Sequence, residues 1–303
     1  MKVFVTGVAG QLGHDVMNEL PRRGHEGIGS DRAATYTNVG DSTDLKMSYY
    51  PLDITNNADV ERVLDEVKPD VVIHCAAWTA VDLAEDEDNI PIVHAVNAVG
   101  TEYLALACKH LGCKMMYIST DYVFNGQGEA PWDPDNKDYQ PLNIYGQTKL
   151  EGELAVARHL SAFYIVRIAW VFGLHGNNFV KTILRLGKTH ETLRVVNDQI
   201  GTPTYTLDLA RLLVDMIETD HYGYYHVTNE GDYISWYDFA CEVFKITGYN
   251  TRVIPVTTQE YGLSKAKRPN NSRLNREKVA LNGFKPLPEW KDALARYLKD
   301  IGQ

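Results

Sequence analysis

Hydrophobic and polar positions in the first part of the chain follow two alternating patterns. Short runs rich in β-branched and aromatic residues, such as Lys2–Thr6, predict strands, and apolar residues four positions apart, as in Gln11–Arg23, predict amphipathic helices. The run Asp70–Ala76 is apolar almost throughout, which is typical of a strand buried on both faces of a parallel sheet. Strands that alternate with helices at this spacing predict an α/β fold with a Rossmann-type, doubly wound parallel sheet.

The same patterns predict where the remaining elements lie. Strands are expected at Glu26–Ser30, up to Asp53, and at Lys114–Ser119, Phe163–Ala169 and Tyr224–Thr228. Helices are expected at Asp59–Val67, Ile92–Leu111, Tyr145–Leu160, Asp208–Glu218, Trp236–Thr247 and Trp290–Ile301. The pattern loosens after about residue 171, so we expect a Rossmann domain over residues 1–170, to which residues 196–228 return, and a smaller C-terminal region over residues 171–195 and 229–303.

The composition of the 303-residue chain excludes several classes of protein. A net charge of −10, without a basic stripe, argues against a nucleic-acid partner. No run of about 18 apolar residues predicts a transmembrane helix, and the chain begins with a predicted strand rather than a signal peptide, so we expect no membrane association. Four cysteines without a C-x-x-C pair predict buried, reduced thiols in a cytoplasmic protein and argue against zinc. The acidic stretch Asp82–Asp88 is interpreted as a solvated loop or helix start.

A glycine-rich turn follows the first predicted strand. Gly7, Gly10 and Gly13 have the spacing G-x-x-G-x-x-G between a strand and a helix, which is the context of dinucleotide binding. Gly7 permits the tight turn, Gly10 lets the backbone approach a pyrophosphate, and Gly13 lets helix and strand pack closely. The helix N-terminus offers free amides and a partial positive charge to the phosphates. The expected cofactor is therefore NADH or NADPH.

Residues at the ends of the second and third predicted strands bear on how this cofactor is held. Asp31 can accept hydrogen bonds from ribose hydroxyls and disfavours a 2′-phosphate, whereas the neighbouring Arg32 could bind that phosphate. The two residues leave the choice open, with a slight preference for NADH. Asp53 could approach the adenine, with a strand-end or helix-capping aspartate as the alternative, and Ile54 beside it is a further candidate for cofactor contact.

A tyrosine and a lysine four residues apart lie at the start of a predicted helix, so Tyr145 and Lys149 share one of its faces. A nearby ammonium stabilises a phenolate, so Tyr145 can donate the proton that reduction of a ketone needs, and Lys149 can also hold the nicotinamide ribose. Ser119 and Thr120 end a core strand at the sheet edge where ligands bind, and Thr120 can polarise a substrate carbonyl. The alternative is that Thr120 only caps a turn with Asp121.

Longer strings make a resemblance to a known family specific. These strings are Ala76–Asp82, Ser119–Phe124, Gly176–Phe179, Asn197–Thr204 and Arg268–Pro269 with Ser272 and Leu274. Together with the glycine turn and the Tyr145–Lys149 pair, they resemble the extended short-chain dehydrogenase/reductases and, within these, the dTDP-4-dehydrorhamnose reductase family. The resemblance runs from residue 1 to about residue 295.

The resemblance implies the reduction, by NADH or NADPH, of the C4 ketone of dTDP-4-dehydro-L-rhamnose to dTDP-L-rhamnose. Tyr145 would protonate the C4 oxygen as hydride arrives from the nicotinamide. The implied contacts of the pyrophosphate are Gly10, Gln11 and Leu12, and the implied lining of the dinucleotide groove is Ala76, Ala77 and Thr79. The smaller C-terminal region would be the substrate-binding region, and the protein would be a monomer or a homodimer.

The resemblance also implies a set of contacts with the nucleotide sugar. The implied substrate contacts are Thr120, Asp121, Trp170, Asn178 and Arg268. From the residues themselves, the indole of Trp170 can stack on a sugar or a base, with core packing as the alternative. Arg268 suits a diphosphate, with an ordinary surface arginine as the alternative. Asn97, within a predicted helix, could hydrogen-bond to backbone near the site or organise a water molecule.

Two features depart from the family pattern. Trp78 stands where many relatives have a histidine, so we expect a different pocket shape beside Thr79. Some relatives hold magnesium between subunits through several glutamates. Asp15 and Glu191 match two of those positions and no third is evident, so no metal is expected.

Two other functions remain open. An epimerase or dehydratase of the same superfamily would keep NAD bound through its cycle. A dehydratase would favour Asp-Glu after Thr120, where this chain has Asp121 and Tyr122. A non-catalytic regulatory subunit of the same fold would have no need to retain Thr120, Tyr145 and Lys149 together.

Overall fold

The computed structural model describes residues 1–36 and 48–303, and its centre is a sheet of seven parallel strands. The strands are β1 (Lys2–Thr6), β2 (Glu26–Asp31), β3 (Ser48–Pro51), β4 (Val71–His74), β5 (Lys114–Thr120), β6 (Phe163–Ile168) and β11 (Gly223–His226). Their order across the sheet is β3-β2-β1-β4-β5-β6-β11. The order reverses between β1 and β4, and sheets of this kind bind ligands at that switch point. The predicted Rossmann-type fold is confirmed.

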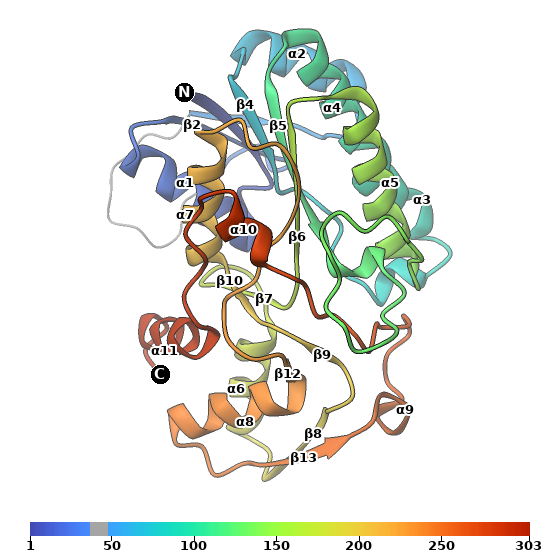
Figure 1. Ribbon diagram of the computed structural model, residues 1–303, viewed down its shortest axis with the longest axis vertical. Helices are drawn as coiled ribbons and strands as arrows, with labels where there is room; N and C mark the ends of the chain where they lie inside the picture. The colour runs from blue at the N-terminus through green and yellow to red at the C-terminus, as the bar shows by residue number, and fades with distance from the viewer. Residues whose placement is uncertain (37–47) are drawn as a thin grey trace.

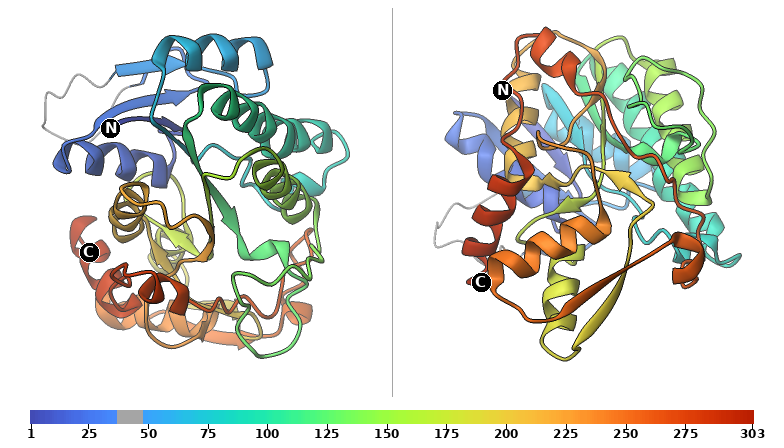
Figure 2. Two further views of the ribbon diagram at one scale, coloured as in Figure 1. Left: turned by 45° about the horizontal axis from the view of Figure 1, so that its top comes forward. Right: turned by 60° about the horizontal axis from the view of Figure 1, so that its bottom comes forward.

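Helices cover both faces of this sheet (Figures 1 and 2). They are α1 (Gln11–Arg22), α2 (Asn57–Val67), α4 (Gly100–Leu111), α5 (Ile144–His159) and α7 (Thr206–Ile217). The helices α1 and α7 bury their apolar faces in one cluster, and α2, α4 and α5 contribute to another on the opposite face. Because successive side chains of a strand point to opposite faces, Val3 and Val5 enter the first cluster and Phe4 enters the second.

Nearly all elements predicted from the sequence lie within two residues of their observed bounds. The exception is the predicted helix Ile92–Leu111, which divides into α3 (Ile90–His94), a π-helical turn η2 (Ala95–Val99) and α4. Within the described ranges this stretch is also the one helical segment long and apolar enough to cross a membrane. Its inner face, however, packs on the sheet through Leu104 and Cys108, as the core-covering helix of a globular domain does.

A smaller set of elements follows β6 and fills the lower part of Figure 1. They are β7 (Val171–Phe172), α6 (Phe179–Gly187), β8 (Thr192–Val196), β9 (Ile200–Gly201), β10 (Thr204–Tyr205), β12 (Ile234–Ser235), α8 (Trp236–Thr247), β13 (Arg252–Val256), α9 (Thr258–Tyr261) and α11 (Trp290–Asp300). A third apolar cluster, with the buried Phe172, Phe239 and Tyr297, joins α6, α8 and α11. The short α10 (Glu277–Leu281) instead returns to the first cluster through Val279. The division of the chain into two domains stays a prediction.

All four cysteines carry free thiols. Cys108 and Cys113 are buried, whereas Cys75 and Cys241 are partly exposed. The prediction of buried thiols is therefore right for two of the four.

Candidate active site

The turn between β1 and α1 packs directly against the end of β4. Gly7 has a φ of 74°, and a Cβ atom there would lie 2.6 Å from the Ala76 amide nitrogen. A Cβ atom on Gly13 would lie 2.3 Å from the Gly7 carbonyl oxygen. Because real Cβ atoms do not come so close to backbone, both positions require glycine for the fold itself. The sequence prediction assigned these two roles correctly.

The first amides of α1 face the carboxyl edge of the sheet. Gly10 is the N-cap residue and supplies no side-chain cap, and both Ala9 and Gly10 are exposed. Gln11 is partly exposed, whereas Leu12 is 7% exposed and belongs to the first apolar cluster. An exposed, uncapped helix N-terminus offers free amides and a positive dipole end to an anion. The turn therefore fits the pyrophosphate of a dinucleotide.

Asp31, at the end of β2, is hydrogen-bonded to this turn. Its Oδ2 accepts a hydrogen bond from the Ala9 amide at 3.1 Å, and its Oδ1 accepts one from the Arg32 amide at 2.8 Å. The Arg32 side chain is exposed. A pocket opens beside these residues, lined by Ala9, His14, Asp31, Ala33, Thr35, Tyr36, Tyr49, His175 and Gly176. The carboxylate thus lies where the adenosine ribose of a dinucleotide would be expected.

The other residues assigned to the cofactor lie along the same edge of the sheet. The exposed Asp53 uses Oδ1 to accept hydrogen bonds from the amide and the hydroxyl of Thr55, so it does form the turn named as its alternative role. Ile54 is 6% exposed and packs in the second apolar cluster. After β4, Ala76 and Ala77 are half-buried and Thr79 is exposed.

Thr120, Tyr145 and Lys149 meet at the carboxyl end of β5. Thr120 is the last residue of this strand, and α5 packs its inner face against it. Asn143 starts α5 by accepting a hydrogen bond from the Gly146 amide at 2.8 Å. Burial raises the pKa of the Tyr145 phenol well above its ordinary value, and a hydrogen bond with Thr120 opposes this shift. The phenol is therefore protonated at neutral pH.

Lys149 reaches the sheet beneath this tyrosine. Its side chain is buried, and its Nζ donates a hydrogen bond to the Ile118 carbonyl at 2.7 Å and lies 4.1 Å from the centre of the Tyr117 ring. Burial lowers the pKa of Lys149 to about 7, while Glu153 and then Cys75 act in the opposite direction. Lys149 follows Tyr145 by one helical turn, a spacing at which an ammonium can favour a neighbouring phenolate.

Thr120 forms the turn with Asp121 that was named as its alternative role, and its contact with a substrate carbonyl stays a prediction. Its Oγ1 accepts a hydrogen bond from the Tyr122 amide at 3.2 Å and donates one to Asp121 Oδ1 at 3.0 Å. Asp121 is 3% exposed, and burial raises the pKa of its carboxyl to about 6, with Ser272 and Thr120 opposing the shift. A buried carboxyl with one unpartnered oxygen, Oδ2, therefore lies beside the threonine.

Trp170 follows β6 in a left-handed backbone conformation, with a φ of 52°. Such a conformation costs a non-glycine residue on the order of 1–3 kcal/mol, so neighbouring contacts must hold it. The Trp170 carbonyl accepts a hydrogen bond from the Thr204 amide at 3.1 Å, and its ring stacks on Trp236 with 3.8 Å between ring centres. The indole is half-buried, so both packing and ligand contact are open to it.

Asn178 ties the start of α6 to the glycine turn. Its Oδ1 accepts a hydrogen bond from the Lys181 amide at 3.0 Å. Its Nδ2 donates to Gln11 Oε1 at 3.1 Å and to the Tyr297 hydroxyl at 3.2 Å. The amide is thus engaged by the protein itself and links the smaller region to the start of α1.

Arg268 belongs to a short segment that contacts the start of α5. Its Nη2 donates a hydrogen bond to Asp82 Oδ2 at 2.5 Å, and Asp82 Oδ1 accepts one from the Ala266 amide at 3.0 Å. The Lys267 carbonyl accepts a hydrogen bond from the side chain of Asn143 at 2.8 Å. We name residues 265–268 the strap.

The acidic stretch Asp82–Asp88 does contain a helix start, because Asp82 is the N-cap residue of a short 3-10 helix, Leu83–Glu85, but the stretch is not simply solvated. Besides Asp82, Asp86 pairs with Lys265 of the strap, and Glu85 accepts a hydrogen bond from the Ile144 amide at 2.8 Å. The stretch fixes both the strap and the first turn of α5. In the ranges 1–36 and 48–303, no group of three or more His, Cys, Asp or Glu side chains could hold a metal ion.

Asn97 lies in the π-helical turn η2 and holds the loop after β4. Its Oδ1 accepts a hydrogen bond from the Trp78 amide at 2.8 Å, and its Nδ2 donates to the Trp78 carbonyl at 3.2 Å. The same Nδ2 lies 3.2 Å from the Thr148 hydroxyl of α5. The expected hydrogen bond to backbone near the site is confirmed.

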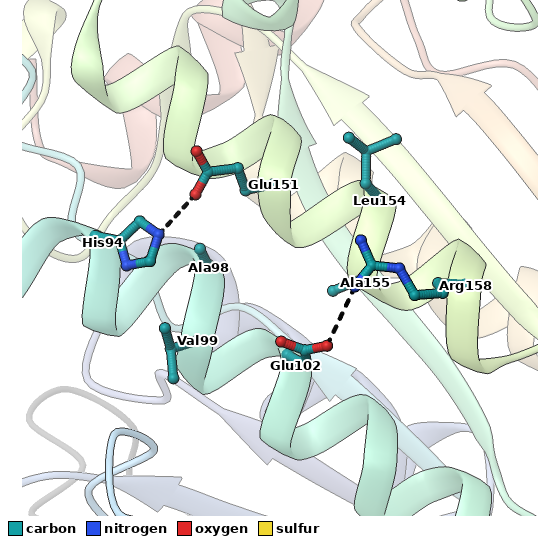
Figure 3. A pocket seen from close by; sticks show the side chains of 8 residues that line it. All are labelled: His94, Ala98, Val99, Glu102, Glu151, Leu154, Ala155 and Arg158. Carbon is teal, nitrogen blue, oxygen red and sulfur yellow. Dashed lines mark hydrogen bonds and ion pairs between the residues drawn. The ribbon is translucent and has the colours of Figure 1, made fainter.

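Another hollow lies on the outer surface, between the helical stretch α3–η2–α4 and α5 (Figure 3). His94 pairs with Glu151 at 2.8 Å, and Arg158 pairs with Glu102 at 3.4 Å across it. Glu151 is two residues from Lys149 and so points away from the inner face of the helix. This hollow is not part of the site.

Several residues of the site were missed by sequence reasoning. They are Asp82, Asn143, Glu153, Arg167, Trp236 and the strap residues before Arg268. Of these, Glu153 carried a usable signal, because it lies four residues after Lys149 and therefore on the same helical face. The partners of Arg268 and Trp170 are distant in sequence and carried none.

Comparison with known proteins places the chain among close relatives. The family model described as RmlD substrate binding domain matches residues 1–303. The spore coat polysaccharide biosynthesis protein SpsK of Bacillus subtilis is 37% identical, over 99% of this chain and 97% of that protein. A crystal structure of a dTDP-4-dehydrorhamnose reductase from Clostridium acetobutylicum is 41% identical with a TM-score of 0.89, and all of both chains is covered. The dTDP-4-dehydrorhamnose reductase of Bacillus anthracis, solved in complex with NADP, is 38% identical with a TM-score of 0.88, over 99% of both chains.

Proposed function

This chain belongs to the RmlD substrate binding domain family, and on that premise we propose that it reduces the C4 ketone of dTDP-4-dehydro-L-rhamnose with NADH or NADPH. The observation that supports the chemistry is the meeting of Thr120, Tyr145 and Lys149 at the end of β5, two strands from the glycine turn of β1. The names of the relatives support the choice of sugar nucleotide.

The proposed roles follow from the state of each side chain. A bound nicotinamide cofactor supplies the hydride. Tyr145 is protonated at neutral pH and would donate its proton to the C4 oxygen. The Thr120 hydroxyl would donate a hydrogen bond to the same oxygen and polarise the ketone. Lys149 would stabilise the phenolate that remains and hold the nicotinamide ribose.

The cofactor would lie along the carboxyl edge of β1, β2 and β4. We assign the pyrophosphate to the backbone of Gly7, Gly10, Gln11 and Leu12, the adenosine end to Asp31, Arg32, Asp53 and Ile54, and the groove beyond it to Ala76, Ala77 and Thr79. The Asp31 carboxylate at the turn supports NADH, whereas the exposed Arg32 leaves room for NADPH. Binding of each cofactor under equal conditions decides between them.

The sugar nucleotide would lie on the other side of Thr120. Asp121 would accept a hydrogen bond from the substrate, Trp170 would stack on its sugar or base, and Arg268 would pair with its diphosphate. Asn178 would contribute from the start of α6. Under this assignment residues 1–170 and 196–228 form the dinucleotide-binding domain, and residues 171–195 and 229–303 form the substrate-binding region.

We further propose that the protein works in the cytoplasm, which its four free cysteines support. A homodimer is the proposed alternative to a monomer, and light scattering of the purified protein distinguishes the two.

Turnover tests the proposed function directly. The purified protein is mixed with NADH or NADPH and with dTDP-4-dehydro-L-rhamnose generated in place, and the absorbance of the reduced nicotinamide is followed. Oxidation that depends on the sugar nucleotide is the expected result. Cofactor binding without oxidation by either cofactor would reject the proposal and favour another sugar or a regulatory subunit.

A further inference from the structure

A buried ion pair lies behind the candidate catalytic residues. Arg167 of β6 and Glu153 of α5 are both 0% exposed. Arg167 Nε donates to Glu153 Oε1 at 2.8 Å, and Nη2 donates to Oε2 at 2.7 Å, so the pair is bidentate. Further partners fix the guanidinium, with Nη1 donating to the Pro134 carbonyl at 3.1 Å and Nη2 to the Tyr139 hydroxyl at 3.0 Å.

This pair is adjacent to Lys149. Glu153 follows Lys149 by one helical turn, and both side chains are buried on the inner face of α5. Arg167 is paired in the sheet with Ser119, the residue before Thr120. The carboxylate therefore lies between the two cations, and the ion pair joins α5 to the strand beside the site.

A contribution to stability does not by itself explain why a charged pair is buried at this position. Burying two charges costs free energy that their attraction seldom exceeds, and apolar replacements are often as stable. Lys149 is also buried, and the recorded contacts of its ammonium are with two neutral groups, the Ile118 carbonyl and the Tyr117 ring. A buried ammonium without a nearby negative charge tends to lose its proton.

We propose that Glu153 is a positioning residue that acts as the counter-ion of Lys149, and that Arg167 holds Glu153 in place for this task. The inference rests on the proposed function only in that Lys149 must be charged to hold the cofactor. The burial that lowers the pKa of Lys149 to about 7 is opposed first by Glu153. The pair also raises the pKa of Arg167 despite its burial, so the guanidinium stays charged.

Other titratable groups also face Lys149 or the elements packed around it. They are Tyr145 and Glu153 on α5, His74 and Cys75 at the end of β4, Tyr117 on β5, Asp121 after β5, Arg167 on β6, Glu85 before α3 and Glu102 on α4. Burial lowers the pKa of His74 to about 3 and raises that of Cys75 to about 12, so both are neutral at the pH of the assay. Glu153 is the negative group that acts most strongly on Lys149.

The substitution Glu153→Gln tests the proposal because it removes the charge and keeps the shape. The readout is the affinity for NADPH as a function of pH, followed by fluorescence in the absence of any sugar. Two unit charges about 6 Å apart at an effective dielectric constant of about 20 interact by about two pKa units. Arg167 keeps its charge in both wild type and variant, so we expect a downward shift of about two units in the pKa of Lys149. With a starting pKa of about 7, NADPH affinity should fall about a hundredfold at about pH 8 and about tenfold at about pH 6.

Glu151→Gln is the matched control. It removes the same charge from the same helix, but Glu151 pairs with His94 on the outer face (Figure 3). The pH dependence of NADPH affinity should not move in this variant. An equal shift in both variants would overturn the proposal, because it would show a general effect of net charge.

A second variant separates charge from packing. Glu153→Gln leaves the buried Arg167 unpaired, so we expect the variant also to lose stability. The double variant Glu153→Leu/Arg167→Met removes both charges at similar volume. Because Glu153 is the nearer charge, the double variant should keep a shift of the same sign and smaller size. Return of the wild-type pH dependence, or a loss of affinity that is equal at all pH values, would overturn the counter-ion role. These binding results do not depend on turnover, so they stand apart from failure of the proposed reductase activity.

Discussion

The substitutions Gly13→Ala and Gly10→Ala separate two reasons for glycine in the turn after β1. A Cβ atom on Gly13 would lie 2.3 Å from the Gly7 carbonyl oxygen, and the neighbouring backbone of the turn cannot move aside as a flexible side chain would. A Cβ atom on Gly10 would lie 3.2 Å from the same oxygen, a close contact that a shift of a few tenths of an ångström relieves. Gly10 also has a φ of −83°, which any residue can adopt.

The two variants should therefore differ in stability. In Gly13→Ala, overpacking costs about 1–3 kcal/mol. The better helix propensity of alanine returns about 0.5–1 kcal/mol, so a net loss of about 1–2 kcal/mol in the free energy of unfolding is expected. In Gly10→Ala, the cost is that of a poorer N-cap, less than about 1 kcal/mol. Urea unfolding followed by circular dichroism measures both.

The two variants should also differ in their affinity for NADPH. If the pyrophosphate approaches the backbone at Gly10, a methyl group there lies between ligand and amide, and affinity should fall at least about tenfold, or 1.4 kcal/mol. Gly13→Ala should weaken binding through displacement of the turn and should lose stability as well. A fully stable Gly13→Ala protein would refute the close packing of α1 on β1. Unchanged NADPH affinity in Gly10→Ala would refute the pyrophosphate site.

Further predictions concern the groups at the end of β5. Tyr145→Phe should lower kcat by about 10²–10⁴ while NADPH affinity stays within about twofold, and unchanged turnover would remove Tyr145 as the proton donor. Lys149→Met should weaken both NADPH binding and turnover, and a loss of turnover alone would contradict the ribose contact. The pKa of Asp121 is raised from 3.8 to about 6, so its ionisation lowers the free energy of unfolding as pH rises from about 4 to about 6. Asp121→Asn should remove that decline and raise the free energy of unfolding at neutral pH by up to about 3 kcal/mol, as measured by urea unfolding at several pH values.

Features encoded by local pattern could be predicted from the sequence. The strands of the central sheet and the helix with Tyr145 and Lys149 depend on spacing along the chain, and the roles of Gly7 and Gly13 depend on one strand–turn–helix unit. Such units bury a defined face, so their periodicity survives in the sequence. The carboxyl edge of a parallel sheet then brings the ends of β1, β4 and β5 to one place without any further information.

Features that depend on partners far apart in sequence could not be predicted. The π-helical turn at Asn97 exists where its side chain must reach both Trp78 and Thr148, and local propensity favours an uninterrupted helix instead. The partner of Arg268 is Asp82, which lies 186 residues away. The acidic residues around Asp82 have the composition of a solvated loop, and only the position of the strap shows that they are bound.

The groups proposed to bind the cofactor and those proposed to bind the substrate differ in whether they already have partners within the protein. On the cofactor side, the amides at the start of α1 are exposed and uncapped, so a pyrophosphate can bind there with little rearrangement. On the substrate side, Arg268 already has a carboxylate partner in Asp82, so pairing with a diphosphate requires either exchange of that partner or sharing of the guanidinium. The neighbouring Lys267 of the same strap contacts Asn143, which caps α5, the helix of Tyr145 and Lys149, so a movement of Arg268 can reach the start of this helix. Under the proposed roles, recognition of the diphosphate and placement of the proton donor would therefore be linked through four consecutive residues of the chain.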